Sequence, residues 1–212
     1  MNAHILNHPL IDHKMALLRD EKRRMPEFKM LLDEIGFLMV YEVTKNLNLE
    51  ETVIKTPVAA TKAKKLENHP ILVTILRAGL GLLDPFMKLM PNSKVGFLGM
   101  DRDEVTLQPR SYYDKIPMQA LKNKVLLIDP MLATGGSALN AIDFLVEKGV
   151  KDITFICLVA APEGIKAIND KYPYIEIYVA ALDDRLNDKG YIVPGLGDAG
   201  DRIFGTEDNE NL

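Results

Sequence analysis

The sequence lacks features typical of several large classes of protein: it has a single cysteine, no long hydrophobic run and no excess of positive charge. One cysteine among 212 residues excludes an internal disulfide and any metal site built from several cysteines. Cys157 lies in an apolar run over residues 153–161, so we expect a small buried side chain there and not a nucleophile. That run has nine residues, well below the roughly 20 that a membrane-spanning helix needs.

Positive charge is not in excess either. The 26 Lys and Arg residues stand against 30 Asp and Glu, a formal net charge of −4. General nucleic-acid binders rely on basic surface to neutralise phosphates, so we expect no nucleic-acid partner. The first residues, MNAHILNHPLIDHK, lack the basic-then-apolar pattern of a signal peptide, so we expect a cytoplasmic protein with no membrane partner. The four histidines lack metal-ligand spacing and are expected on the surface or in packing: His4, His8, His13 and His69.

Strand-like and helix-like segments alternate along the chain. No repeat, low-complexity tract or linker divides it, and 47% hydrophobic residues allow a sizeable core, so we predict one domain over residues 1–212. Continuous apolar runs separated by helix-length segments are typical of a mainly parallel sheet with helices on both faces, an α/β fold. The predicted strands are 70–76, 94–100, 124–129, 153–161 and 175–182, and the predicted helices are 26–46, 80–90, 137–149 and 162–173.

Residues 26–46 carry an unusually wide apolar stripe. Apolar side chains recur there at helical spacing, and three more widen the stripe beyond one face. We expect such a helix to be covered on two sides, and a subunit interface would provide that cover. The stripe consists of Phe28, Leu31, Leu32, Ile35, Leu38 and Met39, widened by Met30, Phe37 and Val40.

In a parallel α/β sheet, ligands bind beyond the carboxyl ends of the strands. Charged and glycine-rich residues gather at those ends, which makes them the candidate site. The strand ends are residues 77–79, 101–103, 129–136 and the stretch around Asp183.

The stretch LLIDPMLATGGSAL indicates an anion site. Asp129 ends a strand, Ser137 is the predicted helix N-cap, and Lys148-Gly149 provides a cationic last turn and a terminating glycine. Residues 134–136 therefore precede a helix N-terminus, where backbone N–H groups, the helix dipole and the hydroxyls of Thr134 and Ser137 favour a phosphate.

The kind of phosphate follows from what this loop lacks. It has neither the lysine of a nucleoside-triphosphate P-loop nor the G-x-G-x-x-G of dinucleotide-binding proteins. A monophosphate cradle remains, with Asp129 seven residues before its last glycine. An acid there can accept hydrogen bonds from vicinal hydroxyls, which suits a ribose 5-phosphate. The alternative is that Asp129 only caps a turn. The ribose 5-phosphate interpretation is favoured because the acid, the phosphate cradle and the start of the helix follow one another at a suitable spacing.

The motif DPMLATGGSA resembles the phosphoribosyl-pyrophosphate motif of type I phosphoribosyltransferases. Asp129-Pro130 stands where most of that superfamily has two adjacent acids, and this form is peculiar to the uracil enzymes. Further segments over residues 8–206 resemble the same enzymes: HPLIDHKMALLRD, ILRAGLGLLD, VGFLGMDRDEVTLQPRSYYDKIP, CLVAAPEG and ALDDRLNDKGYIVPGLGDAGDRIFGT. The resemblance to uracil phosphoribosyltransferases implies the type I fold, with a hood built from the N- and C-terminal segments.

The resemblance implies 5-phosphoribosyl 1-pyrophosphate as one substrate. Residues 134–137 would hold its 5-phosphate, Asp129 its ribose hydroxyls, and Arg77 with Arg102 its diphosphate, because guanidinium forks match phosphate oxygens. Mg²⁺ is implied as a companion of the diphosphate, with no dedicated protein cage. The implied contacts to this substrate are Arg77, Arg102, Asp129, Pro130, Met131, Leu132, Ala133, Thr134, Gly135, Gly136, Ser137 and Asp198.

The second substrate implied is uracil, bound by residues 190–201. Four glycines in these twelve residues let the main chain approach a planar ligand closely. By resemblance, main-chain groups of Ile192, Gly197 and Ala199 contact the base. Asp198, which also contacts uracil, and Arg77 are the implied catalytic residues. Asp198 would either balance positive charge at C1 or take the proton from uracil N1, and both roles stay open.

The implied reaction is displacement of diphosphate from C1 by uracil N1, giving uridine monophosphate in pyrimidine salvage through an oxocarbenium-like transition state. The polar segment 101–117 is long for a connection and is predicted to be a lid. Some relatives are activated by GTP and change oligomeric state, so GTP is a candidate allosteric activator and a homodimer or higher homo-oligomer is expected.

Two rival functions fit the sequence less well. A nucleoside kinase conflicts with the absent P-loop lysine. A non-catalytic regulator that senses uracil nucleotides and reads RNA could have lost Asp198 or Arg77 and should show a basic face, whereas both residues are present and the net charge is acidic.

Overall fold

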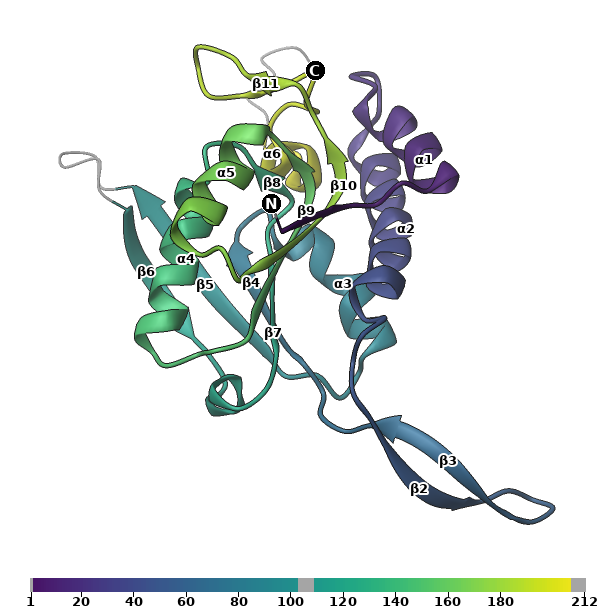
Figure 1. The fold of residues 1–212 in the computed structure, drawn as a ribbon. Helices are drawn as coiled ribbons and strands as arrows, with labels where there is room; N and C mark the ends of the chain where they lie inside the picture. The colour runs from purple at the N-terminus through teal and green to yellow at the C-terminus, as the bar shows by residue number, and fades with distance from the viewer. Residues whose placement is uncertain (1, 103–108, 207–212) are drawn as a thin grey trace.

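The computed structural model describes residues 2–102 and 109–206, with the side chains of residues 100–111 left aside (Figure 1). The helices are α1 (Pro9–Arg19), α2 (Met25–Val43), α3 (Leu80–Leu89), α4 (Gly136–Glu147), α5 (Pro162–Lys171) and α6 (Ala199–Phe204), with a 3₁₀ helix η1 (Met118–Leu121). The strands are β1 (Ala3–Ile5), β2 (Leu49–Lys55), β3 (Ala60–Leu66), β4 (Ile71–Leu76), β5 (Val95–Arg102), β6 (Pro109–Lys115), β7 (Val125–Ile128), β8 (Met131–Leu132), β9 (Ile153–Ala160), β10 (Glu176–Leu182), β11 (Arg185–Leu186) and β12 (Ile192–Val193).

An eight-stranded sheet forms the centre of the molecule. Its order is β1-β10-β9-β7-β4-β5-β6, with β8 pairing to β9. All of these pairs are parallel except β5 with β6. The mainly parallel sheet expected from the sequence is therefore confirmed, and the five predicted strands correspond to β4, β5, β7, β9 and β10.

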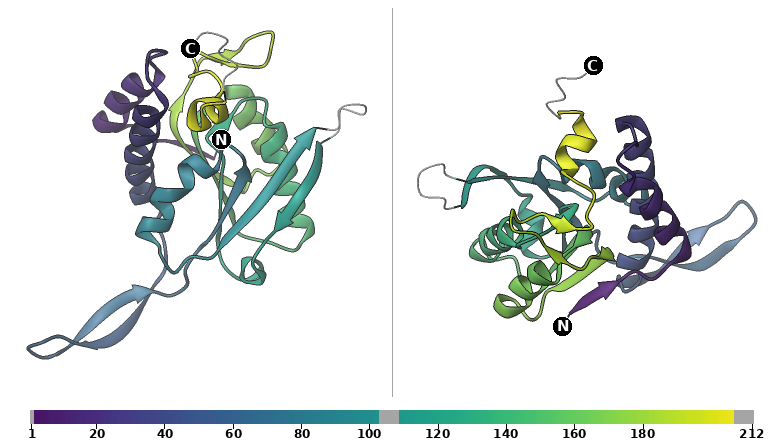
Figure 2. Two further views of the ribbon diagram at one scale, coloured as in Figure 1. Left: turned by 180° about the vertical axis from the view of Figure 1, so that it is seen from behind. Right: turned by 90° about the horizontal axis from the view of Figure 1, so that it is seen from above.

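The inner strands are apolar throughout because helices cover both faces of the sheet (Figure 2). On β7, Leu126 and Ile128 join the core beneath α1, α2 and α3, whereas Val125 and Leu127 join the core beneath α4 and α5. Cys157 lies in the second core, fully buried, and burial raises the pKa of its thiol well above the usual value. The expected burial of Cys157 is confirmed.

Helix α2 is covered within the chain itself. It packs against α1 and α3, and also against α6 and β10, which explains why its apolar stripe is wider than one face. The N- and C-terminal segments meet here: the Arg202 guanidinium lies 4.4 Å from the centre of the Phe28 ring. The expected cover by a subunit interface is therefore not required for most of this helix, although Met30 remains 55% exposed.

The polar segment 101–117 is not one long loop. Strand β5 runs on to Arg102, and β6 returns antiparallel to it, pairing Gly99 with Tyr113. An edge strand needs no continuous apolar run, so the polar sequence of β6 did not indicate a strand. The expected loop is therefore wrong for residues 109–115, which form β6, while the lid role stays a prediction and residues 103–108 lie outside the described part of the chain.

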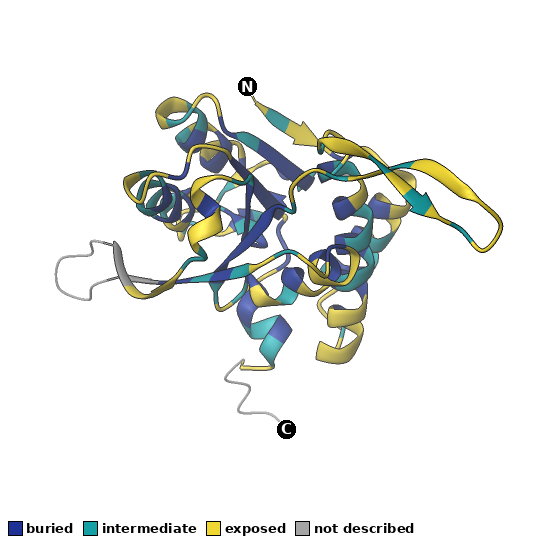
Figure 3. Ribbon diagram, turned by 90° about the horizontal axis from the view of Figure 1, so that it is seen from below, coloured by how far each residue is buried: buried dark blue, intermediate teal, exposed yellow. Residues whose placement is uncertain are grey.

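A hairpin of β2 and β3 extends from the body and was not predicted. Most of its residues are exposed (Figure 3). Glu50 pairs with Lys65 and Glu51 with Lys64 across the two strands. Opposite charges at facing positions favour this antiparallel register.

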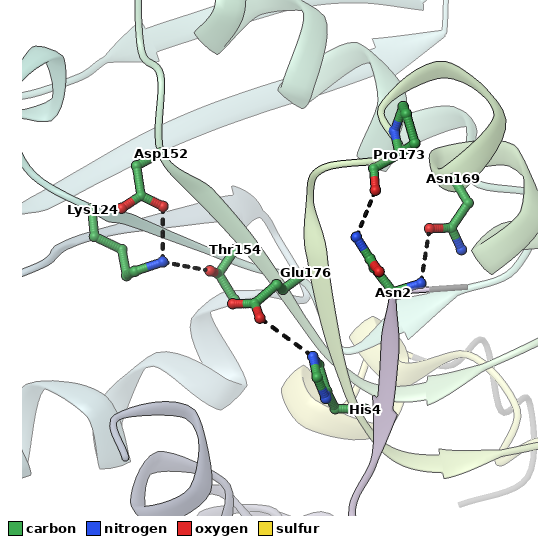
Figure 4. A network of polar contacts seen from close by, with 8 residues as sticks. All are labelled: Asn2, His4, Lys124, Asp152, Thr154, Asn169, Pro173 and Glu176. Carbon is green, nitrogen blue, oxygen red and sulfur yellow. Dashed lines mark hydrogen bonds and ion pairs between the residues drawn. The ribbon is translucent and has the colours of Figure 1, made fainter. Parts of the chain in front are cut away.

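Polar contacts hold the edge strand β1 at the amino ends of the strands (Figure 4). The side-chain amide of Asn2 donates to the Pro173 carbonyl oxygen at 2.6 Å, and His4 Nε2 lies 3.5 Å from Glu176 Oε1. His4 also stacks on Tyr178, while His8 accepts from the Leu10 amide at the start of α1. Both histidines have the surface or packing roles expected of them.

None of the described helices is both long and apolar enough to cross a membrane.

The α2–α3 contact gives a stability prediction. A Cβ at Gly36 would lie 2.6 Å from Pro85 Cγ and 3.3 Å from Leu82 Cδ1. Gly36→Ala should therefore lower the free energy of unfolding by roughly 1–3 kcal/mol through overpacking, despite alanine's better helix propensity. Urea denaturation measures this. Tyr41→Ala, at a 73% exposed position of the same helix, is the control and should stay within about 0.5 kcal/mol. A stabilised Gly36→Ala would contradict the prediction.

Candidate functional site

Three loops meet beyond the carboxyl ends of the parallel strands. They are residues 77–79 after β4, residues 129–136 after β7, and residues 190–201 after β10 and β11. Arg77 Nη2 lies 3.9 Å from Asp201 Oδ1, and a Cβ built on Gly190 would lie 3.9 Å from Thr134 Cγ2. The sequence placed candidate residues on all three loops, and the fold brings them together.

The loop after β7 is fixed by main-chain bonds to β9 and by close contact with α5. Ala161 N–H donates to the Leu132 carbonyl oxygen at 2.9 Å, and Pro130 accepts from two amides of β9. A Cβ on Gly164 would lie 2.5 Å from the Ala133 carbonyl oxygen, so α5 can approach this closely only with glycine there. Pro130 and Leu132 are buried, whereas Met131 and Ala133 are half-buried. These four residues therefore shape the loop.

The helix after this loop begins two residues earlier than a Ser137 cap requires. Gly135 is the N-cap, in the left-handed region at φ 85°, and α4 starts at Gly136. The prediction of Ser137 as N-cap is wrong, because left-handed Gly135 turns the chain into the helix directly. Ser137 instead lies in the first turn, exposed like Thr134. The N–H groups of this turn have no carbonyl partner within the helix, as an anion site needs. At the other end, Lys148 is the C-cap and Gly149 follows at φ 94°, as predicted.

Asp129 is a buried carboxylate beneath this cradle. Its residue is 9% exposed, and burial raises the pKa of its carboxyl from 3.8 to about 7, while a hydrogen bond from the Met131 amide lowers that pKa. A buried acid with so few partners costs free energy unless a ligand supplies hydrogen bonds. The Met131 bond means that Asp129 does cap the turn, and its burial beside the cradle leaves it suited to ligand hydroxyls as well.

The two arginines are placed differently. Arg77 follows β4 and is 62% exposed on its side chain, with Asp201 as its ion-pair partner. The chain folds back tightly behind it, since a Cβ on Gly79 would lie 2.2 Å from Thr74 Oγ1. Arg102 ends β5, and its side chain lies outside the described part of the structure.

The glycine-rich segment folds as a short strand, a turn and a helix start. Gly195 and Gly197 adopt φ of 64° and 81°, which side chains rarely tolerate. Ile192 and Ala199 are buried, and Gly197 is exposed. Asp198 is exposed and accepts from the Asp201 amide at 3.0 Å, so it is the N-cap of α6.

Asp201 is a site residue that the sequence reasoning missed. It pairs with Arg77 and also accepts from the Thr206 hydroxyl at 2.6 Å. Its position within GDAGDR gave no signal of its own, because its partner lies 124 residues earlier in the chain (201 − 77). Over residues 2–102 and 109–206, no three His, Cys, Asp or Glu side chains group as metal ligands would.

Comparison with known proteins identifies the family. The family model described as uracil phosphoribosyltransferase matches residues 5–206. The chain belongs to the uracil phosphoribosyltransferase family. It is 51% identical to the uracil phosphoribosyltransferase of Campylobacter curvus, covering 97% of this chain and 99% of that one. It is 53% identical to the enzyme of that name from Clostridium beijerinckii, covering 95% and 97%.

Two solved structures share the fold of this chain. The AQ2163 protein from Aquifex aeolicus aligns with a TM-score of 0.89 at 40% identity, covering 96% of this chain and 98% of that one. A hypoxanthine-guanine phosphoribosyltransferase from Bacillus anthracis aligns with a TM-score of 0.51 at 15% identity, covering 75% and 80%. The second likeness concerns the fold alone.

The buried carboxyl of Asp129 gives a pH-dependent prediction. Its raised pKa means that the folded state holds this proton more strongly than the unfolded state, so stability falls as pH rises from about 4 to about 7 and stays reduced above 7. Asp129→Asn should therefore stabilise the protein at pH 8 by roughly 1–3 kcal/mol, since each pKa unit corresponds to about 1.4 kcal/mol.

Urea denaturation of the wild type and Asp129→Asn between pH 4 and pH 8 measures this difference. The gain should shrink as the pH is lowered toward 4. Asp184→Asn, at the exposed neighbour of another strand end, is the control and should show no such trend. A gain that stays constant with pH would contradict the assignment of the raised pKa to Asp129.

Proposed function

We propose that this protein transfers the 5-phosphoribosyl group from 5-phosphoribosyl 1-pyrophosphate to N1 of uracil, giving uridine monophosphate and diphosphate. The observation that carries the proposal is the meeting of three loops in a chain of this family: an anion cradle over a buried carboxylate, an arginine loop and a glycine-rich loop. In this proposal, all three loops belong to one phosphoribosyltransferase domain.

The sugar phosphate is assigned to the loop after β7. The first-turn N–H groups of α4 and the exposed hydroxyls of Thr134 and Ser137 hold the 5-phosphate. Asp129 accepts hydrogen bonds from the two ribose hydroxyls, which supply the partners that its buried carboxylate otherwise lacks. Residues 130–133 position this loop and contribute their main chain to the binding surface.

The diphosphate is assigned to Arg77 and Arg102. Arg77 is exposed and its ion pair with Asp201 spans 3.9 Å, so a diphosphate can replace Asp201 as its partner. Mg²⁺ fits here as a companion of the substrate, since its preferred ligands are oxygens and the diphosphate supplies several. When bound, it neutralises charge on the leaving group. Arg77 then orients the diphosphate for departure.

Uracil is assigned to residues 192–199. Backbone N–H, C=O and N–H groups in this order complement the carbonyl, N–H and carbonyl of one uracil edge, with Ile192, Gly197 and Ala199 as their sources. Cytosine would place an amino group against a backbone donor and leave both unpaired, which rejects it by roughly 10⁴-fold.

Asp198 lies between the assigned base and sugar sites. Its carboxylate can balance positive charge on the oxocarbenium-like sugar or accept the N1 proton as the N1–C1 bond forms and the C1–O bond breaks. Its bond to the Asp201 amide holds it in place for either role.

Two further proposals concern assembly and regulation. The protein is proposed to form a homodimer or higher homo-oligomer, with GTP as a candidate activator. Exposed apolar residues on the projecting hairpin, Val53 at 71% and Val58 at 94%, support an additional surface for association. Light scattering with and without GTP, together with the initial rate of product formation, tests both proposals.

The relatives from Campylobacter curvus and Clostridium beijerinckii both carry the enzyme's name, and neither supports a non-catalytic nucleotide sensor.

The proposed reaction predicts the outcome of a direct assay. Purified protein with 5-phosphoribosyl 1-pyrophosphate and Mg²⁺ should form uridine monophosphate from uracil and no product from cytosine. Removing Mg²⁺ with a chelator should abolish turnover. Chromatographic detection of the nucleotide measures this, and absence of product with uracil would contradict the proposed function.

Asp198→Asn separates catalysis from helix capping. Asparagine is as good an N-cap as aspartate, so α6 should persist and the melting temperature should hardly change. The kcat should fall by about 10²-fold or more, because the negative charge is lost. Asp188→Asn, an exposed loop position, is the matched control and should keep wild-type kcat. An unchanged kcat in Asp198→Asn would remove Asp198 from the catalytic residues.

Two glycines flanking α4 test the phosphate cradle. Gly135 and Gly149 both have positive φ, so alanine strains the backbone at either position, and at Gly135 its Cβ would also lie 3.0 Å from Ala167 Cβ, against 3.7 Å from Leu121 Cδ2 at Gly149. Gly135→Ala should raise the KM for the sugar phosphate by about 10-fold or more, because it moves the cradle. Gly149→Ala, at the far end of the helix, should lower stability but leave that KM unchanged. Equal KM effects in both variants would contradict the cradle assignment.

A further inference from the structure

A partly buried ion pair joins the first helix to the glycine-rich loop. Arg19 ends α1, and Asp183 follows β10. Arg19 Nη1 donates to Asp183 Oδ2 at 2.8 Å and Nη2 donates to Oδ1 at 2.5 Å, a bidentate pair. The Asp183 side chain is only 4% exposed and that of Arg19 21%. A pair this buried depends on full hydrogen bonding of both charges.

The remaining hydrogen bonds of this pair go to one residue of the loop. Arg19 Nη1 also donates to the Gly195 carbonyl oxygen at 2.6 Å, and the Gly195 amide donates to Asp183 Oδ2 at 2.8 Å. Both main-chain groups of Gly195 are therefore held by the ion pair. Gly195 has no room for a side chain, since a Cβ would lie 2.2 Å from the Ile192 carbonyl oxygen.

A second guanidinium holds the next carbonyl. Arg202 Nη1 donates to the Leu196 oxygen at 2.9 Å, and Nη2 donates to the Asp20 oxygen at 2.8 Å. A carbonyl and the next residue's N–H share one plane and point in opposite directions. Holding the oxygens of Gly195 and Leu196 thus fixes the peptide planes that lead into Gly197.

We propose that Arg19 and Asp183 are positioning residues that hold the uracil-reading loop in its binding conformation, although neither contacts the base. The inference rests on the proposed function, because it takes residues 192–199 as the base site. A loop with left-handed turns at Gly195 and Gly197 has much conformational freedom when unbound. The ion pair removes that freedom before uracil binds, so α1 contributes to the specificity for the base.

The chain offers a matched control on the same helix. Lys14 Nζ donates to Glu34 Oε2 at 2.7 Å, which joins α1 to α2 without touching the loop. The Lys14 side chain is 22% exposed, close to the 21% of Arg19. Lys14→Met and Arg19→Met therefore both remove a partly buried cation from α1, but only Arg19→Met releases Gly195. Arg19→Lys keeps the charge and loses the planar fork.

Steady-state kinetics distinguish positioning from plain stability. Arg19→Met and Arg19→Lys should raise the KM for uracil by about 10-fold or more, with the KM for the sugar phosphate changed by less than about 3-fold. Lys14→Met should leave both KM values near wild type. If Arg19→Met does not fold, the KM for uracil of Arg19→Lys decides the question. A wild-type uracil KM in folded Arg19 variants, or an equal rise in Lys14→Met, would overturn the proposal.

Hydrogen exchange gives a readout that is independent of turnover. The Gly195 amide should exchange about 10-fold faster or more in the Arg19 variants, because its acceptor Asp183 is released, and at the wild-type rate in Lys14→Met. An unchanged exchange rate of the Gly195 amide in the Arg19 variants would overturn the proposal that the ion pair holds the loop. If the wild type forms no uridine monophosphate, the proposed function fails, while the exchange measurement still decides whether the ion pair holds the loop.

Discussion

Parallel pairing of β4, β7, β9 and β10 is the constraint on which the candidate site depends. Parallel neighbours need a crossover between them, so every strand returns to the same end and finishes at the same edge. The segments that follow β4, β7 and β10 must therefore start close together. Helices on both faces complete the arrangement, because they bury the inner strands and leave polar residues to gather at the strand ends, including this edge.

One feature at this edge carries a cost in stability. Asp129 is buried, and burial raises its pKa to about 7. Gly135 adopts a left-handed conformation to start α4, which glycine tolerates without strain. A buried carboxyl that suits a hydroxyl-bearing ligand is typical of proteins whose function opposes maximal stability. The surrounding contacts, such as the approach of Gly164 to Ala133, keep this arrangement in place.

The sequence predicted the buried parallel strands well and the exposed strands poorly. Strands β4, β7, β9 and β10 were found because burial on both faces leaves a continuous apolar run. Strand β6 and the β2–β3 hairpin escaped because exposed strands carry polar side chains, and in β2 and β3 the charges pair only across the hairpin. The N-cap at Ser137 was misplaced by two residues, because the sequence does not reveal that Gly135 is left-handed.

What the sequence alone determined was the order of elements, the α/β class, the family resemblance and the presence of chemistry-bearing residues at strand ends. These depend on local periodicity and contiguous motifs, which a linear reading can find. Only the tertiary structure decided that Arg77 faces Asp201, that Asp129 is buried, and that Arg19 holds Gly195 from 176 residues away. Such contacts join segments whose spacing along the chain carries no signal, because the packing of elements far apart in the sequence is what brings them together.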